Sequence, residues 1–116
     1  AAHMTPVCDC FGFTGLPVLP DAGIFGSDDI VALEQATLDM LARTPVLEEN
    51  LPGMMEIVNR EGHPWQQIHG VYKDVYEQLA MAEALHMGQR VYELVDVLPV
   101  KEPDFKQVQY IQAAPQ

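Results

Sequence analysis

Two cysteines near the start of the chain are the residues best suited to bind a metal. Cys8 and Cys10 flank Asp9 in an irregular, glycine-flanked segment, whose backbone can bend to aim both thiols at one ion. Zinc and iron–sulfur clusters are commonly held by such thiolates, and four ligands are the norm. The pair therefore supplies half a coordination shell for an iron–sulfur cluster or zinc. His63, His69, a carboxylate or another chain would supply the rest.

The Cys-Asp-Cys sequence has two other interpretations. Both thiols could be reduced and without a ligand, because cysteines this close together rarely form an unstrained disulfide. They could also perform redox or nucleophilic chemistry, which Asp9 disfavours because its charge opposes a thiolate beside it. His63 and His69 lie six positions apart, a spacing without a fixed metal geometry. A surface or hydrogen-bonded role is therefore favoured for both histidines.

Asp21 and Glu34 are the two carboxylates least readily interpreted as ordinary solvent-exposed surface groups. On a helical wheel Glu34 falls between Ile30, Leu38 and Leu41, near the middle of an apolar face. A buried carboxylate has a raised pKa and could act as an acid or base, or it could accept hydrogen bonds from a neighbouring turn. The structural role is favoured. No nucleotide-binding or hydrolase motif occurs in the sequence, so we lean against an enzyme.

The composition excludes some classes of partner. Seventeen acidic residues against six Lys and Arg give a formal charge of −11, which would repel nucleic acid and anionic membranes. No apolar run approaches the roughly 20 residues that cross a bilayer, and no secretion signal is visible. The expected compartment is the cytoplasm. Residues 1–4 (Ala-Ala-His-Met) resemble an expression-tag remnant, residues 5–98 are expected to form one domain, and residues 99–116 a weakly ordered tail.

Periodicity predicts the elements that would position these side chains. Ser27 is the expected N-cap of an amphipathic helix over residues 28–43. A short helix is expected over 52–59, a loop over 63–70, and a second long helix over 73–87 capped by Gly88. Residues 16–19, 23–25 and 91–97 are expected to be strands. The predicted fold class is α/β or α+β, with two main helices packed on a small sheet in two layers.

Four stretches together resemble the C-terminal part of the domain-of-unknown-function 362 family. They are Cys8-Asp9-Cys10, residues 18–24 (Val-Leu-Pro-Asp-Ala-Gly-Ile), residues 27–36 (Ser-Asp-Asp-Ile-Val-Ala-Leu-Glu-Gln-Ala) and residues 92–95 (Tyr-Glu-Leu-Val). Members of the family commonly carry similar motifs in this order, with Pro where this chain has Ile30 and Asp where it has Glu34. Many members are longer and include ferredoxin-type cysteine runs that bind iron–sulfur clusters. This chain lacks those runs.

The resemblance implies Cys8, Cys10, Asp21 and Glu34 as site residues. Three functions follow from the sequence. The first is an accessory domain that binds a metal or iron–sulfur cluster through Cys8 and Cys10, with Asp21 or Glu34 in support. The second is a non-catalytic protein-interaction module with incidental cysteines, whose partner is another protein or a second copy in a homodimer. An enzyme that uses Glu34 as a general acid or base ranks last. The sequence leaves open whether the chain is a full gene product or a fragment.

Overall fold

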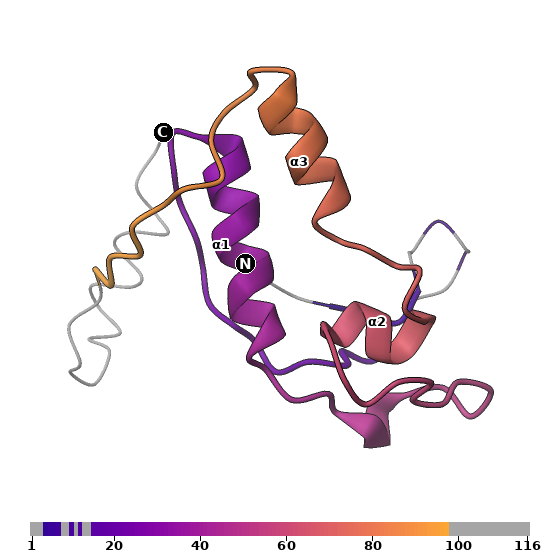
Figure 1. The fold of residues 1–116 in the computed structure, drawn as a ribbon. Coiled ribbons are helices and arrows are strands. Elements are labelled where there is room, and N and C mark those ends of the chain that lie inside the picture. The colour runs from indigo at the N-terminus through magenta and orange to yellow at the C-terminus, as the bar shows by residue number, and fades with distance from the viewer. Residues whose placement is uncertain (1–3, 8–9, 11, 13–14, 98–116) are drawn as a thin grey trace, which may run out of the picture.

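The computed structural model describes residues 4–7, 10, 12 and 15–97, and this part of the chain is helical with long irregular connections. Its elements are α1 (Ile30–Ala42), the 3₁₀ helix η2 (Glu48–Asn50), α2 (Pro64–His69) and α3 (Glu77–Ala84). α1 and α3 pack side by side, and α2 lies beyond one end of α1 (Figure 1). None of the helices in these residues is both long and apolar enough to cross a membrane.

The predicted sheet is wrong, because the described residues contain no strand. Residues 16–19 are irregular with a bend at residues 18 and 19, and single hydrogen bonds stand in place of a ladder: the Val18 amide donates to the Met4 carbonyl at 2.9 Å, and the Leu47 amide donates to the Val18 carbonyl at 2.7 Å. Pro17 and Pro20 flank Val18 and Leu19, and neither proline has an amide hydrogen to donate to a neighbouring strand. Val18 and Leu19 are fully buried, as their apolar character indicated. Only their predicted secondary structure is wrong. The strand expected at 23–25 is absent as well.

The strand predicted at 91–97 is irregular chain instead. β-branched composition favours a strand only where a neighbouring strand and a packing surface are present. Val91 is 85% exposed, and Val95 and Val97 are also exposed. Tyr92 is half-buried and attaches this segment to α1 through its hydroxyl. The segment is held by a side chain and not by a sheet.

α1 confirms the long amphipathic helix predicted over 28–43, although its cap differs. Asp29, not Ser27, is the N-cap, and its Oδ1 accepts hydrogen bonds from the amides of Val31 at 2.9 Å and Ala32 at 3.1 Å. Ser27 Oγ accepts from the Asp29 amide and so supports the cap. Bonding to the Gln89, Ala32 and Val31 amides holds the pKa of Asp29 below its usual value, against a smaller opposing effect of burial.

α2 occupies the segment predicted to be a loop. Pro64 does exclude His63 from helical geometry, as expected, but an extended residue before a first-turn proline is also the geometry of an N-cap. His63 Nδ1 accepts a hydrogen bond from the Trp65 amide at 3.2 Å, which completes the cap. The helix predicted over 52–59 is absent, and a turn closed by the Met55 amide and the Pro52 carbonyl stands there instead.

α3 is shorter than the predicted helix over 73–87, and Gly88 is not its cap. His86 adopts the left-handed conformation (φ 58°), its amide donates to the Glu83 carbonyl, and the Met87 amide donates to the Ala82 carbonyl. This is a Schellman ending with histidine where glycine is usual. Gly88 instead lies against the Asp29 carboxylate, where a Cβ atom would come within 2.8 Å of Asp29 Cγ.

α1 connects two clusters of buried side chains. At one end Leu41 joins residues from the N-terminal segment, the 18–19 stretch and α2, namely Met4, Val18, Leu19 and Ile68. At the other end Val31 and Leu38 pack against Leu79 of α3. Met4, at the end of the expected tag remnant, is thus part of the core. Because α1 contributes to both clusters, it positions the side chains on its solvent edge relative to α2 and α3.

Candidate functional site

The structure brings together only some of the residues that the sequence suggested. Cys8 and Asp9 lie outside the described residues, and Cys10 is exposed. Across residues 4–7, 10, 12 and 15–97, no group of three or more His, Cys, Asp or Glu side chains is arranged to hold a metal ion. Ligation of an iron–sulfur cluster or zinc by Cys8 and Cys10 remains a prediction.

Glu34 is exposed, so the prediction that it lies on the buried face of its helix is wrong. The buried stripe of α1 consists of Val31, Ala32, Ala36, Leu38 and Leu41. It is rotated away from Ile30, which is 61% exposed. Val31 packs against Leu79 of α3, and Ala32 beside it is buried as well, so Glu34 lies at the edge of this stripe. Asp21 is exposed too.

The described residues form a groove of about 1140 Å³. Its walls come from the N-terminal segment (residues 4–7), one edge of α1, Met55, α2 and residues 72–78, which include the start of α3. Buried side chains of Met4, Leu38 and Leu41 contribute to its lining. Glu34 and His69 both line this groove, whereas Cys10, Asp21 and His63 do not. We refer to it below as the helix groove.

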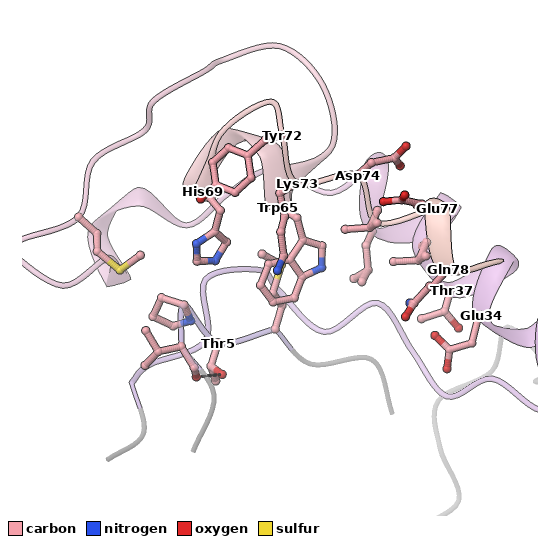
Figure 2. Close-up of a pocket in the computed structure, with 17 residues that line it drawn as sticks. Thr5, Glu34, Thr37, Trp65, His69, Tyr72, Lys73, Asp74, Glu77 and Gln78 are labelled. Carbon is pink, nitrogen blue, oxygen red and sulfur yellow. Dashed lines mark hydrogen bonds between the residues drawn. The ribbon is translucent and has the colours of Figure 1, made fainter. Parts of the chain in front are cut away.

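Aromatic side chains form one part of the helix groove (Figure 2). The rings of Trp65 and His69 stack with centroids 5.4 Å apart and planes 22° apart. Burial, with a smaller contribution from the Lys73 ammonium, lowers the pKa of His69 despite a hydrogen bond to the backbone of Pro6. The imidazole is therefore neutral at pH 7. Tyr72 lies beside this pair in the lining and is 81% exposed.

Carboxylates occupy the other part of the helix groove. Glu34, Asp74 and Glu77 lie toward the end that also holds Thr37 and Gln78 (Figure 2). Among the described residues, Lys73 is the one ammonium group in the lining. Asp74 Oδ1 accepts from the Tyr76 amide at 2.9 Å and so shapes the turn before α3. The groove thus has an aromatic part and an acidic part.

Asp39 is the centre of a hydrogen-bonded cluster that the sequence did not reveal. Its carboxylate accepts from the Tyr76 hydroxyl at 3.0 Å, the Tyr92 hydroxyl at 2.7 Å and Gln35 Nε2 at 3.0 Å. Arg90 Nε donates to Gln35 Oε1 at 2.8 Å. Only the Gln35–Asp39 spacing of four residues is a local signal, since the other donors are far away along the chain. Across the part of the chain that the structure describes, no buried side-chain nitrogen or oxygen lacks a hydrogen-bond partner.

His63 is adjacent to this cluster and is a structural residue. Its Nε2 lies 3.0 Å from the Leu38 carbonyl, and its ring meets that of Tyr76 edge-on at 5.8 Å. Because Nδ1 accepts from the Trp65 amide, Nε2 carries the proton and donates to Leu38. Burial lowers the pKa of His63, against smaller effects of the Leu38 bond and the Asp39 charge. With both ring nitrogens engaged, this imidazole has no nitrogen left for a metal.

A scan of protein-family models, a search of curated proteins and a search of solved structures found no match to this chain. The resemblance to the domain-of-unknown-function 362 family remains a prediction from its motifs.

Proposed function

We propose that this chain is a non-catalytic protein-interaction module that binds a segment of a partner protein in the helix groove. The observation that carries the proposal is the groove itself, where an exposed tyrosine and a stacked Trp65–His69 pair lie over buried apolar side chains. Tryptophan and tyrosine are enriched among the residues that contribute most to binding energy at protein interfaces. A groove between helices is also a common place for a partner peptide to bind.

Three groups with shifted pKa values, Tyr76, Tyr92 and His63, have structural roles. Tyr76 and Tyr92 share the Asp39 carboxylate, and His63 bonds to two backbone groups. These bonds tie α1 to α2, α3 and residues 90–92. A perturbed pKa can indicate a catalytic group, but a structural hydrogen-bond network produces the same shift. The proposal therefore assigns these residues to the scaffold that holds the groove.

Selection from a displayed random-peptide library tests the proposal. We expect peptides selected on the wild-type chain to lose binding to Tyr72→Ala, which removes an exposed ring from the groove. Met54→Ala is the matched control, since Met54 is 93% exposed and lies outside the groove. Both changes are expected to alter stability by less than about 0.5 kcal/mol, because they are surface truncations. Peptides that bind both variants equally, or a selection that enriches none, would contradict the proposal.

A further inference from the structure

We infer that the partner segment is positively charged and amphipathic: its Lys or Arg side chains face Glu34, Asp74 and Glu77, and its apolar side chains contact Trp65 and Tyr72. This inference rests on the proposed function and names the chemistry of the partner. It follows from the division of the helix groove into an aromatic part and an acidic part (Figure 2). A segment with both kinds of side chain would occupy the whole groove.

The charges in the groove favour a cationic occupant. Three carboxylates of the described residues line it against one ammonium group, and His69 is neutral at pH 7. The three carboxylate residues are exposed, so each can turn toward an incoming cation. The whole chain adds to this effect, because its formal charge of −11 steers cations toward the surface and repels anions.

The same charge disfavours a second copy of this chain as the occupant. Two copies would each carry a formal charge of −11. Like charges opposed across an interface are unfavourable, and they suppress wrong partners. A basic segment of another protein meets the groove without that cost.

The aromatic part of the groove provides a built-in reporter. Trp65 is the single tryptophan of the chain, and it lines the groove in a half-buried position. Its fluorescence changes when a side chain packs on the indole or displaces water from it. Tyrosine-free and tryptophan-free peptides can therefore be titrated while emission is followed from this one residue.

The test uses short synthetic peptides that share one pattern of leucines and differ only at the remaining positions, which are all Lys, all Gln or all Glu. Each peptide is titrated into the full chain at low salt, and the change in Trp65 emission is measured. The titration is repeated near 0.15 M salt, where the Debye length is about 8 Å. We expect the Lys peptide to bind most tightly and to weaken as salt is added. The Gln peptide should bind more weakly, and the Glu peptide least.

Two triple variants separate the local charge from the total charge. Glu34→Gln, Asp74→Asn and Glu77→Gln together remove the carboxylates of the groove, and the Asp74→Asn change retains an oxygen that can accept from the Tyr76 amide. The control is Glu49→Gln, Glu56→Gln and Glu61→Gln, which removes as much charge from exposed positions outside the groove. We expect the groove triple to weaken the Lys peptide about tenfold at low salt, as the loss of three exposed ion pairs implies, and the control triple to weaken it much less.

The outcomes distinguish this inference from the proposed function. If the Gln or Glu peptide binds as tightly as the Lys peptide, or if both triples weaken binding equally, the charge inference is wrong. If none of the three peptides changes Trp65 emission while the library yields binders that need Tyr72, the groove is a binding site with another preference and the inference is again wrong. If the library also yields none, the proposed function fails.

Discussion

The Tyr92 hydroxyl donates a 2.7 Å hydrogen bond to Asp39, 53 residues earlier in the chain. The same carboxylate accepts from Tyr76, so it fastens both the start of α3 and the segment after α3 to α1. Neither contact belongs to a helix or a sheet. The described residues contain few regular elements, so side-chain hydrogen bonds of this kind help to place the connections between them.

Replacing Asp39 should therefore destabilise the fold. Asp39→Ala removes the acceptor of three side-chain hydrogen bonds, and the two tyrosine hydroxyls then need new partners. We expect the free energy of unfolding to fall by about 2–4 kcal/mol, because hydrogen bonds to a charged group contribute more than neutral ones. Urea denaturation followed by circular dichroism measures the change. Glu56→Ala, at an exposed position, should change it by less than about 0.5 kcal/mol.

Alkaline pH should weaken the same cluster. Burial and the Asp39 carboxylate raise the pKa of Tyr76 to about 12, and a hydrogen bond to Asp39 followed by burial raises that of Tyr92. Because the pKa of Tyr76 is higher in the folded state than in the unfolded state, its contribution to folding stability is complete below pH 10, the ordinary tyrosine value. That contribution is lost as pH rises toward 12. Ultraviolet titration should show late-ionising tyrosines in the wild type. In Asp39→Asn they should ionise at lower pH; unchanged titration would show that the carboxylate is not the cause.

Mild acid should loosen the junction of α1 and α2. His63 is neutral in the fold, and its pKa is lowered chiefly by burial. A lowered folded pKa means that the stabilisation is present above the ordinary value near 6.5 and is lost as pH falls through the folded pKa. His69 also has a lowered pKa and adds to the effect. We expect His63→Asn, which can still cap α2, to be less stable at pH 7 but to lose less stability between pH 7 and 5 than the wild type. Equal losses would mean that His63 does not titrate in this range.

Gly88 should not tolerate a side chain. A Cβ atom there meets the Asp29 carboxylate that caps α1, at 2.8 Å from Cγ. Gly88→Ala should force this carboxylate to move and cost about 1–2 kcal/mol, the usual value of an N-cap. Gly53→Ala is the matched control, because its Cβ would have no neighbour within 4 Å. A thermal melt that ranks the two variants equally would contradict the placement of Gly88 against α1.

The prediction that Cys8 and Cys10 bind a metal is tested by measuring the metal content of the purified protein. If Cys8 and Cys10 ligate zinc or an iron–sulfur cluster, protein purified without oxygen will contain stoichiometric metal. The Cys8→Ser, Cys10→Ser double variant will have lost it. Metal-free wild type would overturn the accessory-domain hypothesis. The same double variant should bind groove peptides normally, since the described lining of the helix groove includes neither cysteine.

Local signals in the sequence were enough to locate α1 and most of α3. Their apolar residues repeat every three to four positions, and this periodicity depends only on the geometry of a helix. The burial of Val18 and Leu19 also followed from their apolar character. Residues 91–97 show the limit of such signals, because β-branched residues form a strand only when another segment provides a partner. No described segment does so here, and a tyrosine hydroxyl holds the segment to α1 instead.

The sequence by itself determined the acidic charge, the Cys-Asp-Cys motif and the amphipathic character of α1, since each depends on composition or on neighbours a few residues away. Only the tertiary structure decided which side of α1 is buried, and thus that Glu34 faces solvent. It also decided that Trp65, Tyr72 and Glu34 line one groove and that Asp39 binds two distant tyrosines. These relationships depend on which segments pack against α1, and no local pattern encodes the position of a residue 30 or 50 places away.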